Sequence, residues 1–264
     1  MKPLEGIRVI EAAQMVAGPL AGMILAEQGA DVIKVEMPDG VGDRFRGFGS
    51  RRNGMSSAFQ AVNRGKRSVV LDSKTDAGRD ALLRLCATAD VFLQNFRPGA
   101  AERLGLGEDA VRATNPDIVY VSVSGFGATG PRAHEKVYDY VVQAMTGMAT
   151  LQAGDDGTPQ LTRHVGVDKV TAMTVAQAIT AALLARERGH GAQRDDVTRL
   201  DAALWGFWPD GMMDRVRLGD DVYDAPPFGK IASIMATKDG HVSLGTAGGR
   251  TWAALCTAFR PEWL

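Results

Sequence analysis

Cysteine is nearly absent from this sequence: only Cys86 and Cys256 occur in 264 residues. Each lies in an apolar helical pattern, and the two stand at no spacing that suits a metal ion. We therefore expect two buried thiols in a protein of a reducing compartment.

An excess of charge of either sign is also lacking. Thirty Lys and Arg residues face 31 Asp and Glu residues, which gives a net charge of −1. This balance offers no electrostatic basis for binding DNA, RNA or an acidic membrane surface. A hydrophobic share of 45% and a charged share of 23% are ordinary for a soluble globular protein.

Long apolar runs are missing as well. The most apolar helical pattern, Val170–Ala185, contains Gln177 and is short for a membrane span. Near the N-terminus, Glu5, Arg8 and Glu11 interrupt any apolar core of a signal peptide. We expect a soluble, cytoplasmic protein.

Several catalytic motifs are absent. There is no G-x-S-x-G elbow, and neither cysteine has a visible partner base. The four histidines are scattered at no metal-binding interval: His134, His164, His190 and His241. These absences argue against a serine hydrolase, and we predict no metal site.

Apolar runs of strand length alternate with helical patterns. The runs are Ile7–Ala12, Asp31–Glu36, Ser68–Asp72, Val91–Asn95 and Asp117–Gly125. Their continuous apolar character suits strands covered on both faces, and the alternation requires right-handed crossovers. The sequence predicts a doubly wound α/β domain with a mostly parallel, Rossmann-like sheet.

The second half contains the best-marked helix, Asp168–Gly189, with Arg186 and Arg188 near its negative end. A strand over Arg194–Asp201 and a helix from Ala202 are expected to follow. Asp210–Pro227 is typical of a linker, and alternation around Asp239-Gly240 predicts a hairpin before a last helix over Arg250–Phe259. We place a boundary near residue 206, between a large domain (1–205) and a small α+β part (206–264).

The segment Val9–Glu36 has the order strand, small-residue turn, helix, strand of a nucleotide-binding unit. Its turn reads AGPLAG and lacks the G-x-G-x-x-G spacing, and Pro19 removes an N–H group that could face phosphate. NAD is therefore disfavoured, although Glu36 ends the second strand as a ribose-binding acid would. A literal GFGATG at Gly125–Gly130 follows a strand but precedes no immediate helix, so turn chemistry explains it.

Basic loops follow or precede several strands. Asn63–Ser68 precedes one strand, Asn95–Gly99 follows another, and Arg103 comes soon after. Loops at the carboxyl ends of parallel strands bind ligands, and Lys and Arg suit phosphate oxygens. From the residues alone, a solvated turn is the favoured explanation of any one of these loops.

Asp168 admits two interpretations. It could be the N-cap of the long helix, a common position for aspartate. The same helix N-terminus would also suit an ionised carboxylate that acts as a covalent nucleophile. Its position in the sequence does not separate the two.

Six ordered blocks closely resemble the family III CoA-transferases, the formyl-CoA and carnitine CoA-transferase group. They begin with AGPLAGMILAEQGADVIKVEMPDGVGDRFR, NRGKRSVVLDSK and NFRPGAAERLGL. NPDIVYVSVSGFGATGP, VYDYVVQAMTG and GVDKVTAMTVAQAITAALLARERGHGAQRDDVTRLDAAL complete the match. The resemblance implies a cytoplasmic enzyme that transfers coenzyme A from an acyl-CoA to a carboxylic acid, with coenzyme A as substrate and not as a permanently bound cofactor.

The resemblance also implies roles for individual residues. Asp168 would be the nucleophile that forms aspartyl anhydride and aspartyl-CoA intermediates. The positions that match the coenzyme A site are Val16, Ala17, Leu71, Asp72, Ser73, Lys74, Asn95, Phe96, Arg103 and Lys136. Arg103 and Lys136 would supply charge for phosphates, and the apolar positions would flank adenine and pantetheine.

Two departures from the family accompany this match. Met37 stands where some members carry arginine, which puts one phosphate or adenine contact in doubt. Family chains usually continue beyond the hairpin and return to the large domain, and this chain is expected to end before that return segment. Family members form interlocked homodimers, so the resemblance implies a homodimer here too.

Two alternatives stay open. One is an α-methylacyl-CoA racemase on the same fold, which pairs a histidine with aspartate; here Tyr138-Asp139 occupies the matching position, and His134 lies nearby. The other is a non-catalytic CoA-binding subunit.

Overall fold

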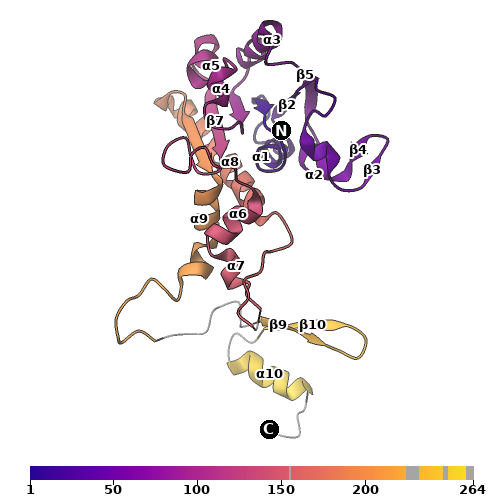
Figure 1. Ribbon diagram of the computed structural model, residues 1–264, viewed down its shortest axis with the longest axis vertical. Coiled ribbons are helices and arrows are strands. Elements are labelled where there is room, and N and C mark those ends of the chain that lie inside the picture. Colours follow the sequence, from indigo (N-terminus) through magenta and orange to yellow (C-terminus); the bar gives the residue numbers. More distant parts are fainter. Residues whose placement is uncertain (155, 224–231, 246–248, 260–264) are drawn as a thin grey trace.

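A six-stranded, all-parallel sheet lies in the upper part of the computed structural model as drawn in Figure 1. The structure describes residues 1–154, 156–223, 232–245 and 249–259. The strands are β1 (Arg8–Ala12), β2 (Asp31–Glu36), β5 (Arg67–Val70), β6 (Val91–Gln94), β7 (Val119–Ser124) and β8 (Arg194–Thr198). Their order is β5-β2-β1-β6-β7-β8, and every neighbouring pair runs parallel. The doubly wound α/β fold is confirmed.

Helices cover both faces of this sheet, which explains the continuous apolar character of its strands. On one face, Val9 and its equivalents pack against α1 (Ala17–Glu27) and α8 (Gly166–Ala185). On the other face, Ile10 and its equivalents pack near α3 (Asp76–Cys86), α4 (Ala100–Arg103) and α5 (Glu108–Thr114). Cys86 is buried there, and burial raises the pKa of its thiol to about 12.

The strand order reverses direction between β1 and β6. From β1 the chain proceeds to β2 and β5, whereas from β6 it proceeds to β7 and β8. Loops that leave the carboxyl ends on either side of such a switch point diverge and leave a crevice, where α/β sheets bind ligands. The first turn, before α1, and the loop before α4 border this point.

The glycines of the AGPLAG turn serve packing between α1 and β1. A Cβ atom on Gly18 would collide with the Cβ of Ala13, and one on Gly22 would collide with the Glu11 carboxylate. The helix therefore lies close against the end of β1. Gly29, at φ +111°, follows the C-cap of α1 and turns the chain toward β2.

The long helix α8 lies in the core. By length and composition Gly166–His190 could cross a membrane, yet half of its most apolar window is buried here against α1 and the sheet. At its far end Arg186 binds Asp90 Oδ1 at 2.8 Å and the Asp117 carbonyl at 3.2 Å, just before β6 and β7. Gly189, at φ +83°, ends the helical path through a short π turn, Arg186–His190.

Three expectations for the second half need correction. The strand expected over Arg194–Asp201 ends at Thr198, because the Thr198 hydroxyl accepts from the Asp201 N–H and starts α9 at Arg199 rather than Ala202. α9 (Arg199–Met212) continues past Pro209 to Met212, and its end therefore overlaps the start of the expected linker, Asp210–Pro227. Residues 224–227 of that linker lie outside the described residues. The division near residue 206 stays a prediction, and that position lies within α9.

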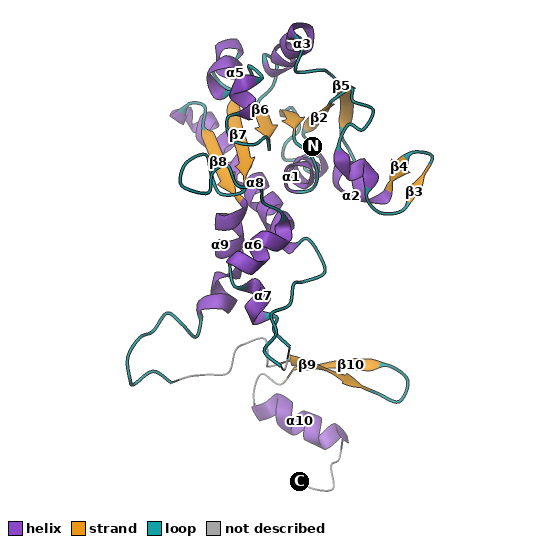
Figure 2. Cartoon of the chain, in the orientation of Figure 1, coloured by secondary structure: helices purple, strands orange, loops and turns teal. Residues whose placement is uncertain are grey.

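The expected hairpin is present as β9 (Ala232–Ala236) and β10 (His241–Gly245), which pair antiparallel. α10 (Gly249–Phe259) follows it, and both lie apart from the sheet in Figure 2. The elements between the predicted ones are η1 (Arg44–Gly47), β3 (Arg51–Arg52), β4 (Met55–Ser56), α2 (Ser57–Asn63), α6 (Asp139–Met145) and α7 (Met148–Leu151).

Candidate active site

The residues expected to bind coenzyme A lie on the loops and first helical turns that follow the carboxyl ends of parallel strands. Val16 and Ala17 follow β1, Leu71–Lys74 follow β5, and Asn95 and Phe96 follow β6. Arg103 ends α4, and Lys136 lies in the loop between β7 and α6. Because the strands are parallel, these loops share one edge of the sheet. Their role toward coenzyme A stays a prediction.

Exposed cations and apolar side chains alternate along this edge. Lys74, Arg103 and Lys136 are exposed, whereas Val16 and Ala17 are buried. Phe96 lines a pocket with Arg97, over one face of β7 and β8 and beside the end of β6. The edge thus presents donors for phosphate beside surfaces for apolar groups.

Met37, the position that departs from the family, also lies at this edge. The Ser73 hydroxyl donates to the Met37 sulfur at 3.4 Å, so the two side chains meet between the β2 and β5 loops. A thioether offers no charge to a phosphate. Any charged contact at the edge must therefore come from other residues.

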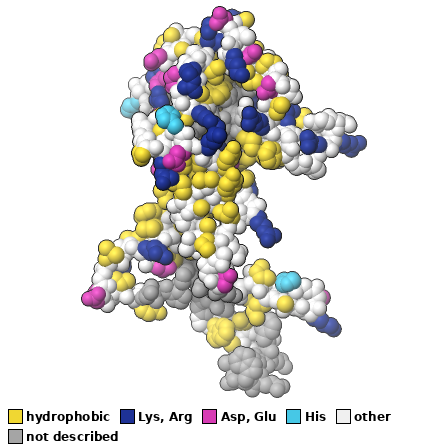
Figure 3. Space-filling view, in the orientation of Figure 1, with side chains coloured by type: hydrophobic (Ala, Val, Ile, Leu, Met, Phe, Trp, Pro, Cys, Tyr) yellow, Lys and Arg dark blue, Asp and Glu magenta, His cyan; other side chains and the backbone are white. Residues whose placement is uncertain are grey.

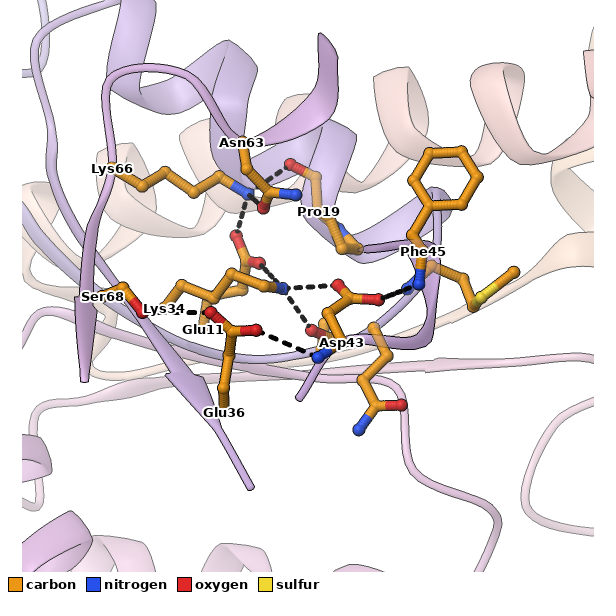
Figure 4. A network of polar contacts seen from close by, with 12 residues as sticks. Glu11, Pro19, Lys34, Glu36, Asp43, Phe45, Asn63, Lys66 and Ser68 are labelled. Carbon is orange, nitrogen blue, oxygen red and sulfur yellow. Dashed lines mark hydrogen bonds and ion pairs between the residues drawn. The ribbon is translucent and has the colours of Figure 1, made fainter. Parts of the chain in front are cut away.

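A buried group of four charges lies beneath the first turn (Figure 4). Lys34 Nζ contacts Glu11 Oε1 at 3.1 Å and Asp43 Oδ2 at 2.8 Å, and Lys66 Nζ contacts Glu11 Oε2 at 2.7 Å. All four side chains are at most 2% exposed. Two cations balance two anions, which makes such burial tolerable.

Glu36 and Arg46 extend this group with a further ion pair. Arg46 donates to both Glu36 oxygens, at 2.8 and 2.7 Å, and the Asp43 N–H and Ser68 hydroxyl donate at 3.0 Å each. Burial by itself would raise the pKa of Glu36, but these donors, Arg46 foremost, outweigh it and lower the pKa to about 2. The acid that resembled a ribose ligand is thus fully engaged inside the protein.

The buried charges shape the first turn. Asp43 Oδ1 accepts from the Met15 N–H at 3.0 Å, and Met15 has φ +70°, a conformation that residues with side chains rarely adopt. Val16 and Ala17 follow directly. The ion pairs therefore support, from below, the backbone that borders the expected coenzyme A site.

Asp168 is not an N-cap. α8 begins at Gly166 after Val165, so Asp168 is its third residue, and its carboxylate instead accepts from Arg199 Nε at 2.7 Å. The residue is 8% exposed. The interpretation of Asp168 as an N-cap is therefore wrong. Its carboxylate forms an ion pair with Arg199 instead of capping the helix.

Asp139 fixes the start of α8. Its Oδ2 accepts from the Asp168 N–H at 2.9 Å, and its Oδ1 accepts from Gln143 Nε2. Gln143 Oε1 in turn accepts from the N–H and the hydroxyl of Thr162, each at 3.0 Å. This chain of bonds joins α6, the 152–165 loop and α8, and so determines where the Asp168 side chain lies.

Arg199 and Gln143 are functional candidates that sequence reasoning did not identify, and it considered Asp139 only as part of the position that matches the racemase motif. Arg199 directly follows β8, so it lies at the same carboxyl edge as the other loops. Asp139 and Gln143 stand four residues apart, a spacing that brings them together on α6. In the sequence, Thr198 and Asp201 are spaced as in a helix N-cap, and this spacing could have placed Arg199 at the carboxyl end of β8.

His134 does not join this constellation. It is exposed in the loop between β7 and α6, and within the described residues no hydrogen bond or ion pair connects it to Asp168. Among the described residues, no cluster of three or more His, Cys, Asp or Glu suits a metal ion.

Comparisons with known proteins give a consistent picture. Rv3272 from Mycobacterium tuberculosis, named a probable fatty acyl-CoA transferase, is 37% identical over 97% of this chain and 68% of its own length. A succinate–glutarate CoA-transferase from Agrobacterium fabrum is 37% identical over 96% of this chain and 66% of its own. A mouse succinyl-CoA:glutarate CoA-transferase is 34% identical over 97% of this chain and 59% of its own.

Solved structures agree. The crystal structure of Rv3272 matches with a TM-score of 0.83, 36% identity and coverage of 98% of this chain and 69% of that one. A CAIB/BAIF family protein from Brucella suis matches with a TM-score of 0.84, 33% identity and coverage of 97% and 69%. The chain thus spans about three fifths to two thirds of the length of these relatives. Residues 4–264 match CoA-transferase family III, and the chain belongs to that family.

Proposed function

We propose that this chain transfers coenzyme A between an acyl-CoA thioester and a carboxylic acid, with Asp168 as the covalent nucleophile. The observation that carries the proposal is the arrangement around Asp168, whose carboxylate lies at the start of α8. Asp139 accepts from the backbone N–H of Asp168, and Arg199 pairs with its carboxylate. It lies at the same sheet edge as the loops expected to bind coenzyme A.

The reaction would proceed in balanced acyl transfers. An Asp168 oxygen attacks the thioester carbonyl, the C–S bond breaks, and a mixed anhydride and CoA thiolate form. The thiolate attacks the aspartyl carbonyl, which releases the donor's carboxylate and leaves an aspartyl-CoA thioester. The acceptor carboxylate then attacks this thioester, its C–S bond breaks, and a second mixed anhydride and CoA thiolate form. Attack of the thiolate on the acceptor's carbonyl completes the new acyl-CoA and restores Asp168.

The residues of the sheet edge would hold the nucleotide part. Exposed Arg103, Lys136 and Lys74 would bind phosphates, and Val16, Phe96 and Leu71 would flank adenine and pantetheine. Backbone N–H groups near the start of α8 would stabilise the developing oxyanion.

Short acids are the substrate class that we propose to examine first. Relatives bear the names of transferases for succinate and glutarate, oxalate, and mesaconate. A panel of short mono- and dicarboxylic acids against their CoA esters would identify the pair. Substrate pockets discriminate by shape and a few polar groups, so one pair should exceed the rest clearly.

The test is chemical trapping. The chain is incubated with acyl-CoA, quenched with hydroxylamine, and digested for mass spectrometry. A transferase gives a hydroxamate on Asp168 and, with an acceptor acid added, a new CoA ester. Asp168→Ala should abolish both while acyl-CoA still binds, and Asp117→Asn serves as the matched control, because Asp117 is an exposed carboxylate before the amino end of β7, at the opposite edge of the sheet.

Other outcomes would favour the alternatives. Exchange of the α-proton without transfer would indicate the racemase, and binding without either reaction would indicate a non-catalytic subunit. If Asp168→Ala still exchanged coenzyme A, the nucleophile would be another residue.

We also propose that the protein is a cytoplasmic homodimer. Hydrophobic side chains gather over the middle of the face in Figure 3, and Trp205 and Trp208 of α9 are 77% and 52% exposed. Such exposure on one helix is typical of an interface. Analytical ultracentrifugation of the chain would test it.

A further inference from the structure

Arg199 occupies an electrostatically unusual position for a cation. It is the first residue of α9, a fourteen-residue helix, and it lies beside the start of α8. Helix N-termini carry partial positive charge, which disfavours arginine there. An anion beside the guanidinium offsets this cost, and Asp168 supplies one, together with Asp201 in the first turn of α9.

The guanidinium of Arg199 is only partly used. Nε donates to Asp168 Oδ1 at 2.7 Å, and within the described residues the two terminal nitrogens form no hydrogen bond. The Arg199 side chain is 15% exposed. Its two terminal nitrogens are not buried, so they reach solvent. Two parallel N–H donors are the geometry that binds a carboxylate.

Covalent chemistry at Asp168 would change the charge on this pair. The aspartate is an anion at rest, but in the aspartyl-CoA thioester it is neutral. Arg199 then loses the one charged carboxylate that it contacts among the described residues, while Asp139 and Asp201 are occupied by the hydrogen bonds that start α8 and α9. A free carboxylate in the same place would restore the charge balance, and the proposed reaction requires one there at that stage.

We propose that Arg199 binds the substrate's carboxylate: first the acid released from the donor, then the acceptor acid that replaces it. The inference rests on the proposed function. The pairing with Asp168 at rest keeps the acid from binding before the thioester forms. The acceptor carboxylate then lies beside the carbonyl that it attacks.

Binding measurements test this without turnover. Asp168→Asn is nearly isosteric and neutral, so it imitates the charge of the intermediate. Because charge-assisted hydrogen bonds are among the stronger ones, we expect succinate to bind this variant at least about tenfold more tightly than the parent chain. Succinamide, which has no charge, should bind neither protein.

A second substitution assigns the gain to Arg199. Asp168→Asn combined with Arg199→Met should lose the tighter binding. Asp168→Asn combined with Arg64→Met should keep it, since Arg64 forms an exposed ion pair with Glu27 elsewhere. If Asp168→Asn gains nothing, or if the gain survives removal of Arg199, the proposal is wrong.

Kinetics with Asp168 intact give an independent readout. Arg199→Met should raise KM for the acceptor acid about 10- to 100-fold, while trapping of Asp168 by acyl-CoA changes little. Arg199→Lys keeps the charge and should show a smaller rise. Impaired trapping with an unchanged KM for the acid would show that Arg199 only positions Asp168, which overturns the proposal. A parent chain that never forms the hydroxamate contradicts the proposed function, and the succinate measurement still decides the role of Arg199.

Discussion

Asn95 binds the backbone of Gln14 twice: the Gln14 N–H donates to Oδ1 at 2.9 Å, and Nδ2 donates to the Gln14 carbonyl at 2.8 Å. The two residues belong to loops after β6 and β1, the strands between which the sheet changes direction. One side chain therefore fixes the spacing of the two loops that border the switch point.

Asn95→Ala should weaken binding of acyl-CoA, because the first turn loses both bonds to the neighbouring loop. Two hydrogen bonds correspond to about 1–3 kcal/mol, so we expect about a tenfold increase in Kd by calorimetry. Asn115→Ala is the control, since Asn115 also donates to backbone carbonyls, of Ala89 and Cys86, but away from this edge. Equal losses of affinity in both variants would contradict a local role for Asn95.

Lys34→Met should destabilise the protein strongly, since it leaves Asp43 and Glu11 buried with too few cations. Breaking a buried ion pair costs about 3–5 kcal/mol, which urea unfolding would measure. Glu11→Gln combined with Lys66→Met removes one charge of each sign. This double variant should cost less than the sum of its single variants; additivity would show that the four charges do not act as one group.

The lowered pKa of Glu36 predicts a specific loss of stability in acid. The pKa of a free glutamate is near 4.5 and that of Glu36 about 2, so its contribution is complete above pH 4.5 and disappears as the pH falls toward 2. The expected loss is roughly 3 kcal/mol for this buried group. Glu36→Gln should show a correspondingly flatter dependence of unfolding free energy on pH between 5 and 2.5. Parallel curves for the two proteins would refute this assignment.

Asp139→Asn should impair turnover more than acyl-CoA binding. Both Asp139 oxygens accept, from the Asp168 N–H and from Gln143, and an amide presents a donor on one side. The start of α8 would shift, so kcat should fall about tenfold or more for a displaced nucleophile, with KM for acyl-CoA nearly constant. Steady-state kinetics beside the control Asp117→Asn, at the opposite edge of the sheet, would show it, and a change confined to KM would contradict it.

Gly22→Ala should destabilise the protein despite the better helix propensity of alanine. Propensity favours alanine by about 1 kcal/mol. Overpacking costs about 1–3 kcal/mol, and here the new methyl group meets a carboxylate that Lys66 holds in place. Thermal unfolding should show a lower Tm than for Gly47→Ala, where no atom lies within 4 Å of the added group. An increase in Tm would mean that the carboxylate can move.

Most of the sheet was predictable from sequence because its four central strands, β2, β1, β6 and β7, are largely buried on both faces and form continuous apolar runs, such as Val119–Ser124. The segment between Met37 and Arg67 was not, because its short elements are held by the buried charges and by Asp43 rather than by apolar periodicity. Asp168 was found through family resemblance. Its pairing with Arg199 depends on where Thr198 ends a strand, a local hydrogen bond that alternation of residues does not encode.

The two ends of α8 are tied to different features of the molecule. Arg186 joins one end to the residues that precede β6 and β7, and Asp139 holds the other end at the nucleophile. The twenty-residue helix between these ties sets where the backbone of Asp168 lies relative to the sheet. For the reaction proposed at Asp168, acids of different size must then be accommodated by the surrounding loops, because the backbone of α8 is tied at both ends.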